Sequence, residues 1–297
     1  MRSGSDCRME ASASTPLMHP SPALKEEEGC EKKDERARRT MRMLSVDAST
    51  IFHFCCVGLV VSVLLPYVIA VRLGHVAVFL PMISDCQVRE PEAYFSRALF
   101  VLFGGCGTAL MSSIQMSHIR SRMRSTSTLP PHRGTSKSAL GDRLNNISLV
   151  LAFVCSASTV GVSVVSKASN RYVHDRFALL AFVGWNVHMY MLFIIYRKFA
   201  GVMPESQRGT PSRGTAMLKR WHRLLRLVFC IGTSACIGLF ITFLHLGYYH
   251  RDTKYRIAIC EWLAFACIVA FHWLAVPELD LDDDFVVTAN IGLRDRN

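Results

Sequence analysis

The sequence lacks the motifs of the common catalytic and metal centres. It contains no glycine-rich phosphate-binding loop, no recognisable pair of nucleophile and base, no CxxC and no Cys/His spacing typical of zinc sites. Most of its eleven cysteines fall within apolar stretches, where a thiol packs as a small hydrophobic group. We therefore expect a protein that is not an enzyme and holds no cofactor and no metal, although membrane acyltransferases can also lack recognisable motifs.

Charge is also scarce. Only 19% of the 297 residues are charged and 51% are hydrophobic, which is too apolar for an ordinary soluble domain. Six stretches are almost uncharged, and each has the length of about 17 to 25 residues that a helix needs to cross a bilayer. The sequence therefore predicts an all-α fold, a polytopic membrane protein with a six-transmembrane helix bundle. The predicted spans are residues 51–71, 98–119, 144–166, 177–196, 227–249 and 257–276.

The regions outside the spans lack the composition of a folded domain. Residues 1–49 have no aromatic side chain and are rich in Ser, Glu, Lys and Arg, so we predict a disordered cytosolic tail there. They also lack the apolar core of a signal peptide, and we expect none to be cleaved. Residues 50–277 form the predicted six-span membrane domain, and residues 278–297 form an acidic cytosolic tail.

Acidic residues are few in two of the predicted connections. Residues 120–143 carry six basic residues against one acid, and residues 197–226 carry eight against one. The positive-inside rule places these connections and both termini in the cytosol. This distribution of the net charge of +11 indicates membrane topology and argues against nucleic-acid binding. The polar segment Leu80–Phe95 between the first two spans then faces the lumen or the cell exterior.

The segment Leu80–Phe95, LPMISDCQVREPEAYF, is the candidate site. Pro81 and Pro91 bracket the segment, so the first helix must end before the segment is complete. Pro91 with the following Glu92 suits the first turn of the next helix. Ser84 and Asp85 either shape the turn through hydrogen bonds to the backbone or bind a partner. A disulfide between Cys86 and Cys260, which lies near the same membrane face, remains open. The exoplasmic site residues are Pro81, Ile83, Ser84, Asp85, Pro91 and Glu92.

Polar residues inside the predicted spans form a second candidate set. Glu261 is the only carboxylate within an apolar run, and a buried acid needs a partner, for which we select His245. Asn186 and His188 are expected to form hydrogen bonds to neighbouring helices, and a proton relay is the alternative. A structural role and a transport path both stay open for this set.

A basic amphipathic segment precedes the fifth span. In TAMLKRWHRLLRL, residues 215–227, basic side chains alternate with Leu and Trp, which is the pattern of a helix lying on the inner leaflet. The segment either anchors the chain beside the membrane or attracts anionic phosphoinositides. The predicted lipid contacts are Lys219, Arg220, Arg223 and Arg226.

Three stretches together resemble the damage-regulated autophagy modulator family. They are RLGHV followed by FLPMISDCQVREPEAYF at residues 72–95, VHDRFALLAFV at residues 173–183, and AICEW at residues 258–262. The resemblance extends from about Ile51 to Asp284; Met82 stands where the family has an aromatic residue, and Cys86 follows the ISD tripeptide. The family belongs to a wider Frag/DRAM/Sfk six-helix membrane group, which includes remodelling factors for glycosylphosphatidylinositol anchors and adaptors of phosphoinositide kinases.

The resemblance implies a non-enzymatic regulator of autophagy, and of stress-linked cell death, in the lysosomal or endosomal membrane. Its expected partners are membrane lipids, including anionic phosphoinositides, and protein adaptors. One alternative is a lipid-remodelling factor or kinase adaptor at the Golgi or plasma membrane. A second alternative is a transporter of ions or small solutes.

Overall fold

The computed structural model describes residues 43–125, 135–200, 213–247, 251–280 and 286–290. The chain divides into two units. The unit Val46–Val287 contains all the described helices. The other unit, Met1–Ser45 with Thr288–Asn297, contributes to the described residues only parts of two strands, β1 (Met43–Asp47) and β2 (Val286–Asn290), which pair in a two-stranded sheet. We did not predict these strands, and the rest of the predicted N-terminal tail, residues 1–42, lies outside the described residues.

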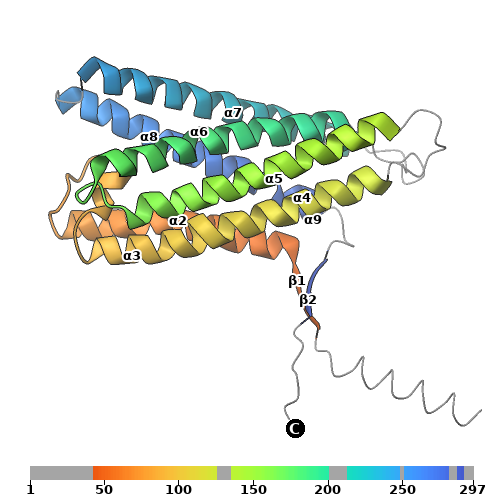
Figure 1. Cartoon of the computed structure of the whole chain (residues 1–297), viewed down its shortest axis with the longest axis horizontal. Helices are drawn as coiled ribbons and strands as arrows, with labels where there is room; N and C mark the ends of the chain where they lie inside the picture. Colours follow the sequence, from red (N-terminus) through yellow and green to blue (C-terminus); the bar gives the residue numbers. More distant parts are fainter. Residues whose placement is uncertain (1–42, 126–134, 201–212, 248–250, 281–285, 291–297) are drawn as a thin grey trace, which may run out of the picture. The chain divides into compact units, whose positions relative to one another are not determined.

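Six long apolar helices confirm the predicted all-α membrane bundle (Figure 1). The first is α2 (Ala48–Arg72), and the second joins α3 (Glu92–Leu99), the π-helix η2 (Phe100–Gly107) and α4 (Thr108–Ser125). The others are α5 (Thr135–Val164), α6 (Arg171–Ile195) with the π-helix η4 (Tyr196–Ala200), α7 (Arg213–Gly247) and α8 (Arg251–Trp273). A short helix, α9 (Val276–Asp280), follows.

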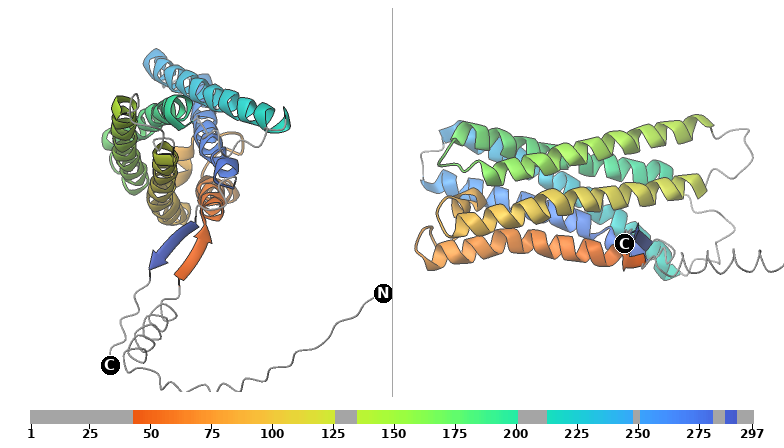
Figure 2. Two further views of the ribbon diagram at one scale, coloured as in Figure 1. Left: turned by 90° about the vertical axis from the view of Figure 1, so that its right-hand side faces the viewer. Right: turned by 60° about the horizontal axis from the view of Figure 1, so that its bottom comes forward.

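The helices run antiparallel in sequence order, and α5 packs on α6 while α7 packs on α8 (Figures 1 and 2). The connections 73–91 and 165–170, the end of α7 and the start of α8 therefore share one end of the bundle. We call it the loop end; it is the end predicted to be exoplasmic. Large apolar side chains such as Phe54, Val150 and Val228 are exposed on the outer surface, as expected where a bilayer replaces water.

The π-helix η2 lies where the second span is rich in glycine. A Cβ atom on Gly104 would lie 2.8 Å from the methyl group of Thr159 on α5, so glycine permits the close approach of these two helices. The hydroxyl of Thr108 meets that of Ser156 on α5 at 2.8 Å, which links the same pair of helices. The second span and α5 therefore pack closely at this level.

Turn chemistry fixes both helix ends next to the site. Gly74 has φ of +71°, a conformation that favours glycine, and the backbone N–H of His75 donates to the carbonyl of Ala70 at the end of α2. At the start of α6, the side chain of Asn170 caps the helix by accepting from the N–H of Val173 at 3.1 Å. The connections at the loop end are thus held in defined positions relative to their helices.

Candidate functional site

Residues 73–91 fold back onto the loop end instead of extending away from it. The short 3₁₀-helix η1 (Ile83–Gln87) forms the centre of this segment, and α3 starts at Glu92 directly after Pro91, as predicted. Ile83, Ser84, Cys86 and Gln87 are all buried. The segment predicted as the candidate site is therefore part of the packed bundle.

Two neighbouring residues of α8 hold this segment. The backbone N–H of Ile83 donates to Oε2 of Glu261 at 2.9 Å, and the indole N–H of Trp262 donates to the carbonyl of Pro81 at 2.8 Å. Leu80, just before these contacts, has φ of +39°, which is uncommon for a residue with a side chain and costs free energy. The contacts made by Glu261 and Trp262 compensate for that cost and fix the start of η1.

The connection 165–170 closes the site from another side. Lys167 Nζ lies 3.1 Å from Asp85 Oδ1 and 3.3 Å from Ser84 Oγ, and the Lys167 side chain is mostly buried. Nδ1 of His174, a residue of α6 that is 2% exposed, lies 2.8 Å from the carbonyl oxygen of Val165. Ser84 and Asp85 thus contact a lysine of the connection between α5 and α6.

A second buried carboxylate, Glu92, is paired with a histidine. Its Oε1 lies 2.6 Å from His75 Nδ1, and Glu92 is 1% exposed. The pair joins the start of α3 to the end of α2. Glu92 therefore holds the C-terminal end of residues 73–91 in place. Pro91, which precedes it, sets the boundary of α3.

Cys86 is buried within the segment, and both it and Cys260 are free thiols, so the disulfide left open by the sequence is not formed. Burial, together with the negative charges of Glu261, Asp85 and Glu92, raises the pKa of the Cys86 thiol to about 12. A thiol with such a pKa is almost entirely protonated near neutral pH and reacts slowly.

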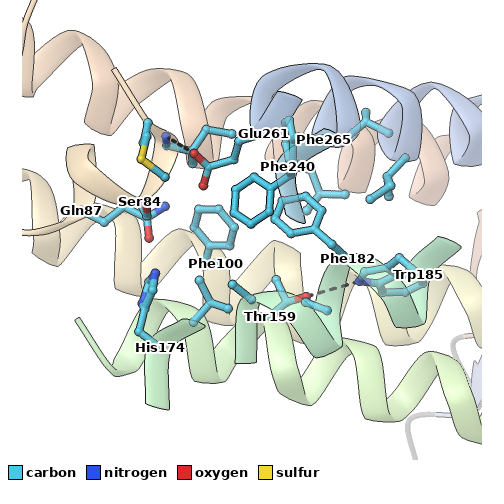
Figure 3. Close-up of a pocket in the computed structure, with 18 of the residues that line it drawn as sticks. Ser84, Gln87, Phe100, Thr159, His174, Phe182, Trp185, Phe240, Glu261 and Phe265 are labelled. Carbon is cyan, nitrogen blue, oxygen red and sulfur yellow. Dashed lines mark hydrogen bonds between the residues drawn. The ribbon is translucent and has the colours of Figure 1, made fainter. Parts of the chain in front are cut away.

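A cavity of about 110 Å³ lies directly behind this segment, between the helices (Figure 3). At the loop end its wall is polar and includes Ser84, Gln87, Lys167, His174 and Glu261. Its middle is apolar. The apolar wall includes Leu59, Phe100, Phe182, Phe240, Phe265 and Val269. The cavity is therefore amphipathic, with its polar end at the predicted exoplasmic face.

The deep end of the cavity reaches a cluster of aromatic rings. Trp185 and His272 both line it, with ring centroids 5.2 Å apart, and His272 stacks on His188 at 5.9 Å. His188 Nδ1 lies 3.0 Å from the hydroxyl of Ser148 on α5. Neither ring nitrogen of His272 has a hydrogen-bond partner among the described residues. The cavity is thus lined by His272 at depth and by polar residues such as Glu261 and Gln87 at its mouth.

A smaller cavity of about 20 Å³ adjoins the first between α6, α7 and α8. Phe182, Phe240 and Glu261 line both cavities, and Leu179, which is 40% exposed, lines the smaller one at the outer surface. Another cavity has a volume of about 390 Å³ and shares Met82 with the first as a lining residue. Its other lining residues include His75, Arg89, Lys254 and Tyr255.

The predicted intramembrane set is only partly gathered at this site. Glu261 lines the cavity, and His188 contacts it indirectly through His272. Asn186 points elsewhere, because its amide donates to Ser234 on α7 at 2.9 Å, which confirms the predicted bond between helices. The predicted partner of Glu261 was wrong, since His245 is exposed and the carboxylate accepts from the Ile83 backbone.

The predicted inner-leaflet set also needs a correction. Arg220 and Arg223 are exposed near the start of the fifth span, and the side chain of Lys219 lies outside the described residues. Arg226 is only 2% exposed, with its guanidinium 4.3 Å from the ring centroid of Tyr196, so the prediction of a lipid contact is wrong for this residue. It faces the bundle because α7 is one continuous helix that packs on α6 and α8 at this level.

The polar residues of the site that were not predicted include Gln87, Lys167, His174 and His272. Gln87 lies two residues after the ISD tripeptide, and that proximity was the signal available. Lys167 lies in the short connection between the third and fourth predicted spans and His272 near the end of the sixth, and neither position has a signal that singles it out. No cluster of three or more His, Cys, Asp or Glu side chains that could hold a metal ion occurs within the described residues.

A match to a known protein family identifies the family of this chain. Residues 48–281 match the family described as the Frag1/DRAM/Sfk1/Cwh43P N-terminal domain. The chain belongs to this family. The match begins at the first residue of α2 and ends just after α9, so it covers the whole helical bundle. No curated protein and no solved structure matches the chain.

Proposed function

We propose that this member of the Frag1/DRAM/Sfk1/Cwh43P family is a non-enzymatic regulator of autophagy, and of stress-linked cell death, in the lysosomal or endosomal membrane. We further propose that it acts by binding a membrane lipid in the 110 Å³ cavity at the loop end. The assignment to autophagy rests on the resemblance of three sequence stretches to the damage-regulated autophagy modulator family.

One observation carries the proposal. The three stretches lie far apart in the sequence, yet residues from each of them line the same cavity. Ile83 and Gln87 come from the first stretch, His174 and Phe182 from the second, and Glu261 from the third. The segments that resemble this family therefore converge on one site, which supports a shared role for the cavity.

The amphipathic wall of the cavity supports a lipid as its occupant. A polar end near the membrane surface and an apolar interior match the two parts of an amphiphile, and sites between helices of a bundle are common ligand sites. The exposed Arg220 and Arg223 at the opposite end offer a surface for anionic lipids or for the proposed adaptors.

Lipid remodelling or kinase anchoring at the Golgi or plasma membrane is the second candidate. The same cavity favours it, because a remodelling factor must also hold a lipid. Transport has less support, since Asn186 and His245 lie away from the cavity that Glu261 and His272 line.

The test uses cells that lack the protein and are complemented with a tagged copy. The expected result is overlap of the tag with a lysosomal marker and recovery of autophagic flux, measured as cargo turnover with and without a lysosomal inhibitor. A tag confined to the Golgi or plasma membrane, with unchanged flux, contradicts the proposal and favours the second candidate.

A further inference from the structure

From the polar end of the cavity we infer that its occupant is a long-chain primary amine, such as the amino-alcohol head and single chain of a sphingoid base. This inference rests on the proposed binding of a membrane lipid in the cavity. It adds the chemical class of the lipid, and it assigns Glu261 and Gln87 as the groups that recognise the head.

Hydrogen-bond acceptors dominate the polar end. Gln87 is 6% exposed, lines the cavity, and its Oε1 has no hydrogen-bond partner among the described residues. An amide oxygen left buried without a donor costs about 1–3 kcal/mol. In Figure 3 the side chain of Gln87 lies beside Ser84 at the cavity wall, opposite Glu261. A ligand that donates a hydrogen bond at this position removes the cost.

His174 adds another acceptor. Its Nδ1 lies 2.8 Å from a carbonyl oxygen, which can only accept, so Nδ1 carries the proton. In the neutral ring Nε2 is then an acceptor, and in Figure 3 the ring extends from α6 toward Ser84 and Gln87. The head that fits these groups must therefore supply several N–H or O–H donors.

The charges favour a cation over an anion. Two carboxylates, Asp175 and Glu261, line the cavity together with one lysine, Lys167, and the ammonium of that lysine lies 3.1 Å from a further carboxylate, Asp85. The hydrogen bonds to Glu261 come from neutral backbone N–H groups, those of Ile83 and Ser84, and Lys167 adds an electrostatic attraction. A buried carboxylate is stabilised by a charged donor more than by a neutral one. An ammonium head provides that donor, whereas a phosphate or carboxylate head is repelled.

The shape of the cavity selects a single chain. Its volume of about 110 Å³ is below the roughly 150 Å³ of an engineered cavity that holds one benzene molecule. It therefore has room for part of one alkyl chain and not for the two chains of a phospholipid. The adjoining 20 Å³ cavity, which shares Phe182 and Phe240, leads to Leu179 at the outer surface. The chain passes between these two rings into the bilayer.

The test uses the purified full-length protein in nanodiscs with photoactivatable, clickable lipids of equal chain length. The probes are a sphingoid base, a fatty alcohol and a fatty acid. We expect the amine to label the protein about tenfold more than the acid, as one charge-assisted hydrogen bond predicts. Labelled peptides should come from α6 and α7 near Phe182 and Phe240.

Variants identify the recognising groups. Glu261→Gln keeps an acceptor for Ile83 and should lower amine labelling about tenfold while leaving alcohol labelling within about twofold. Gln87→Leu should reduce labelling by both the amine probe and the alcohol probe. Ala178→Phe adds a ring at the cavity wall and should abolish labelling, whereas Leu180→Phe, at an exposed position of the same helix, should leave it unchanged. Monodispersity and the melting temperature report whether each variant is folded.

Each contrary outcome has its own meaning. Equal labelling by amine and acid, or unchanged amine labelling in folded Glu261→Gln, overturns the inferred head group but leaves lipid binding intact. Labelled peptides near Arg89 and Lys254 place the lipid in the 390 Å³ cavity and overturn the inferred site. Absence of labelling by all three probes contradicts lipid binding itself, and with it that part of the proposed function.

Discussion

The carboxylate of Glu261 on α8 accepts a hydrogen bond from the backbone N–H of Ile83, 178 positions earlier in the chain, at 2.9 Å. This bond joins the last span to the segment that follows the first. It also places the carboxylate at the mouth of the cavity. The same residue therefore fixes the loop and defines the polar end of the site.

Replacing Glu261 should separate its structural role from its charge. Glu261→Leu leaves the Ile83 N–H without an acceptor and should destabilise the protein by about 1–3 kcal/mol relative to Glu261→Gln, which retains an acceptor. Thermal unfolding of the purified variants measures the difference. Equal melting temperatures for the Leu and Gln variants would show that the bond adds nothing to stability.

The reactivity of Cys86 should depend steeply on pH. Its pKa is raised to about 12 by burial and by neighbouring carboxylates. Because the thiolate is the reactive form, only about one Cys86 in 100,000 is reactive at pH 7, and the alkylation rate should rise about tenfold per pH unit up to pH 10. Mass spectrometry of the peptide containing Cys86 measures the rate. A plateau near pH 9, as for an ordinary thiol, would disprove the raised pKa.

Arg226 and Arg223 should behave differently although they lie one helical turn apart. Arg226→Met removes a buried guanidinium that contacts Tyr196 and the carbonyl of Leu274, and should lower stability by about 1–3 kcal/mol. Arg223→Met should change stability by less than about 0.5 kcal/mol, and should weaken binding to anionic vesicles by about 1 kcal/mol. Melting temperatures and vesicle flotation test the pair. Equal melting temperatures would contradict the burial of Arg226.

The predicted orientation can be tested with two exposed positions. Val78 is 73% exposed at the loop end, and Arg223 is exposed at the other end of the bundle. On sealed lysosomes, a membrane-impermeant maleimide should label Arg223→Cys and should leave Val78→Cys unlabelled until detergent is added. Labelling of Val78→Cys before detergent would reverse the orientation and place the cavity mouth in the cytosol.

The six spans could be predicted because length and apolarity alone determine which helices can cross a bilayer. The start of α3 at Glu92 was also predictable, since Pro91 with a following acid has a local physical meaning. The partner of Glu261 was not predictable in this way. A backbone N–H has no signature in the sequence, and Ile83 approaches Glu261 only after the loop has folded.

Two further contacts were not predictable for a similar reason. The helix of the fourth span starts at Arg171, six residues before the predicted start of the span, and the stacking of His188 on His272 of α8 appears only once the helices have packed. For Arg226, the alternation of basic and apolar residues correctly indicated a helix. The alternation did not reveal which face of α7 packs on the neighbouring helices.

Filling the cavity in living cells tests the central claim most directly. Ala178→Phe should abolish the recovery of autophagic flux in cells that lack the protein, because the added ring occupies the space proposed for the lipid. Leu180→Phe, on the exposed side of α6, should restore flux like the unchanged protein. Both variants must reach the lysosome at equal levels. Full recovery with Ala178→Phe would contradict the assignment of the cavity as the functional site.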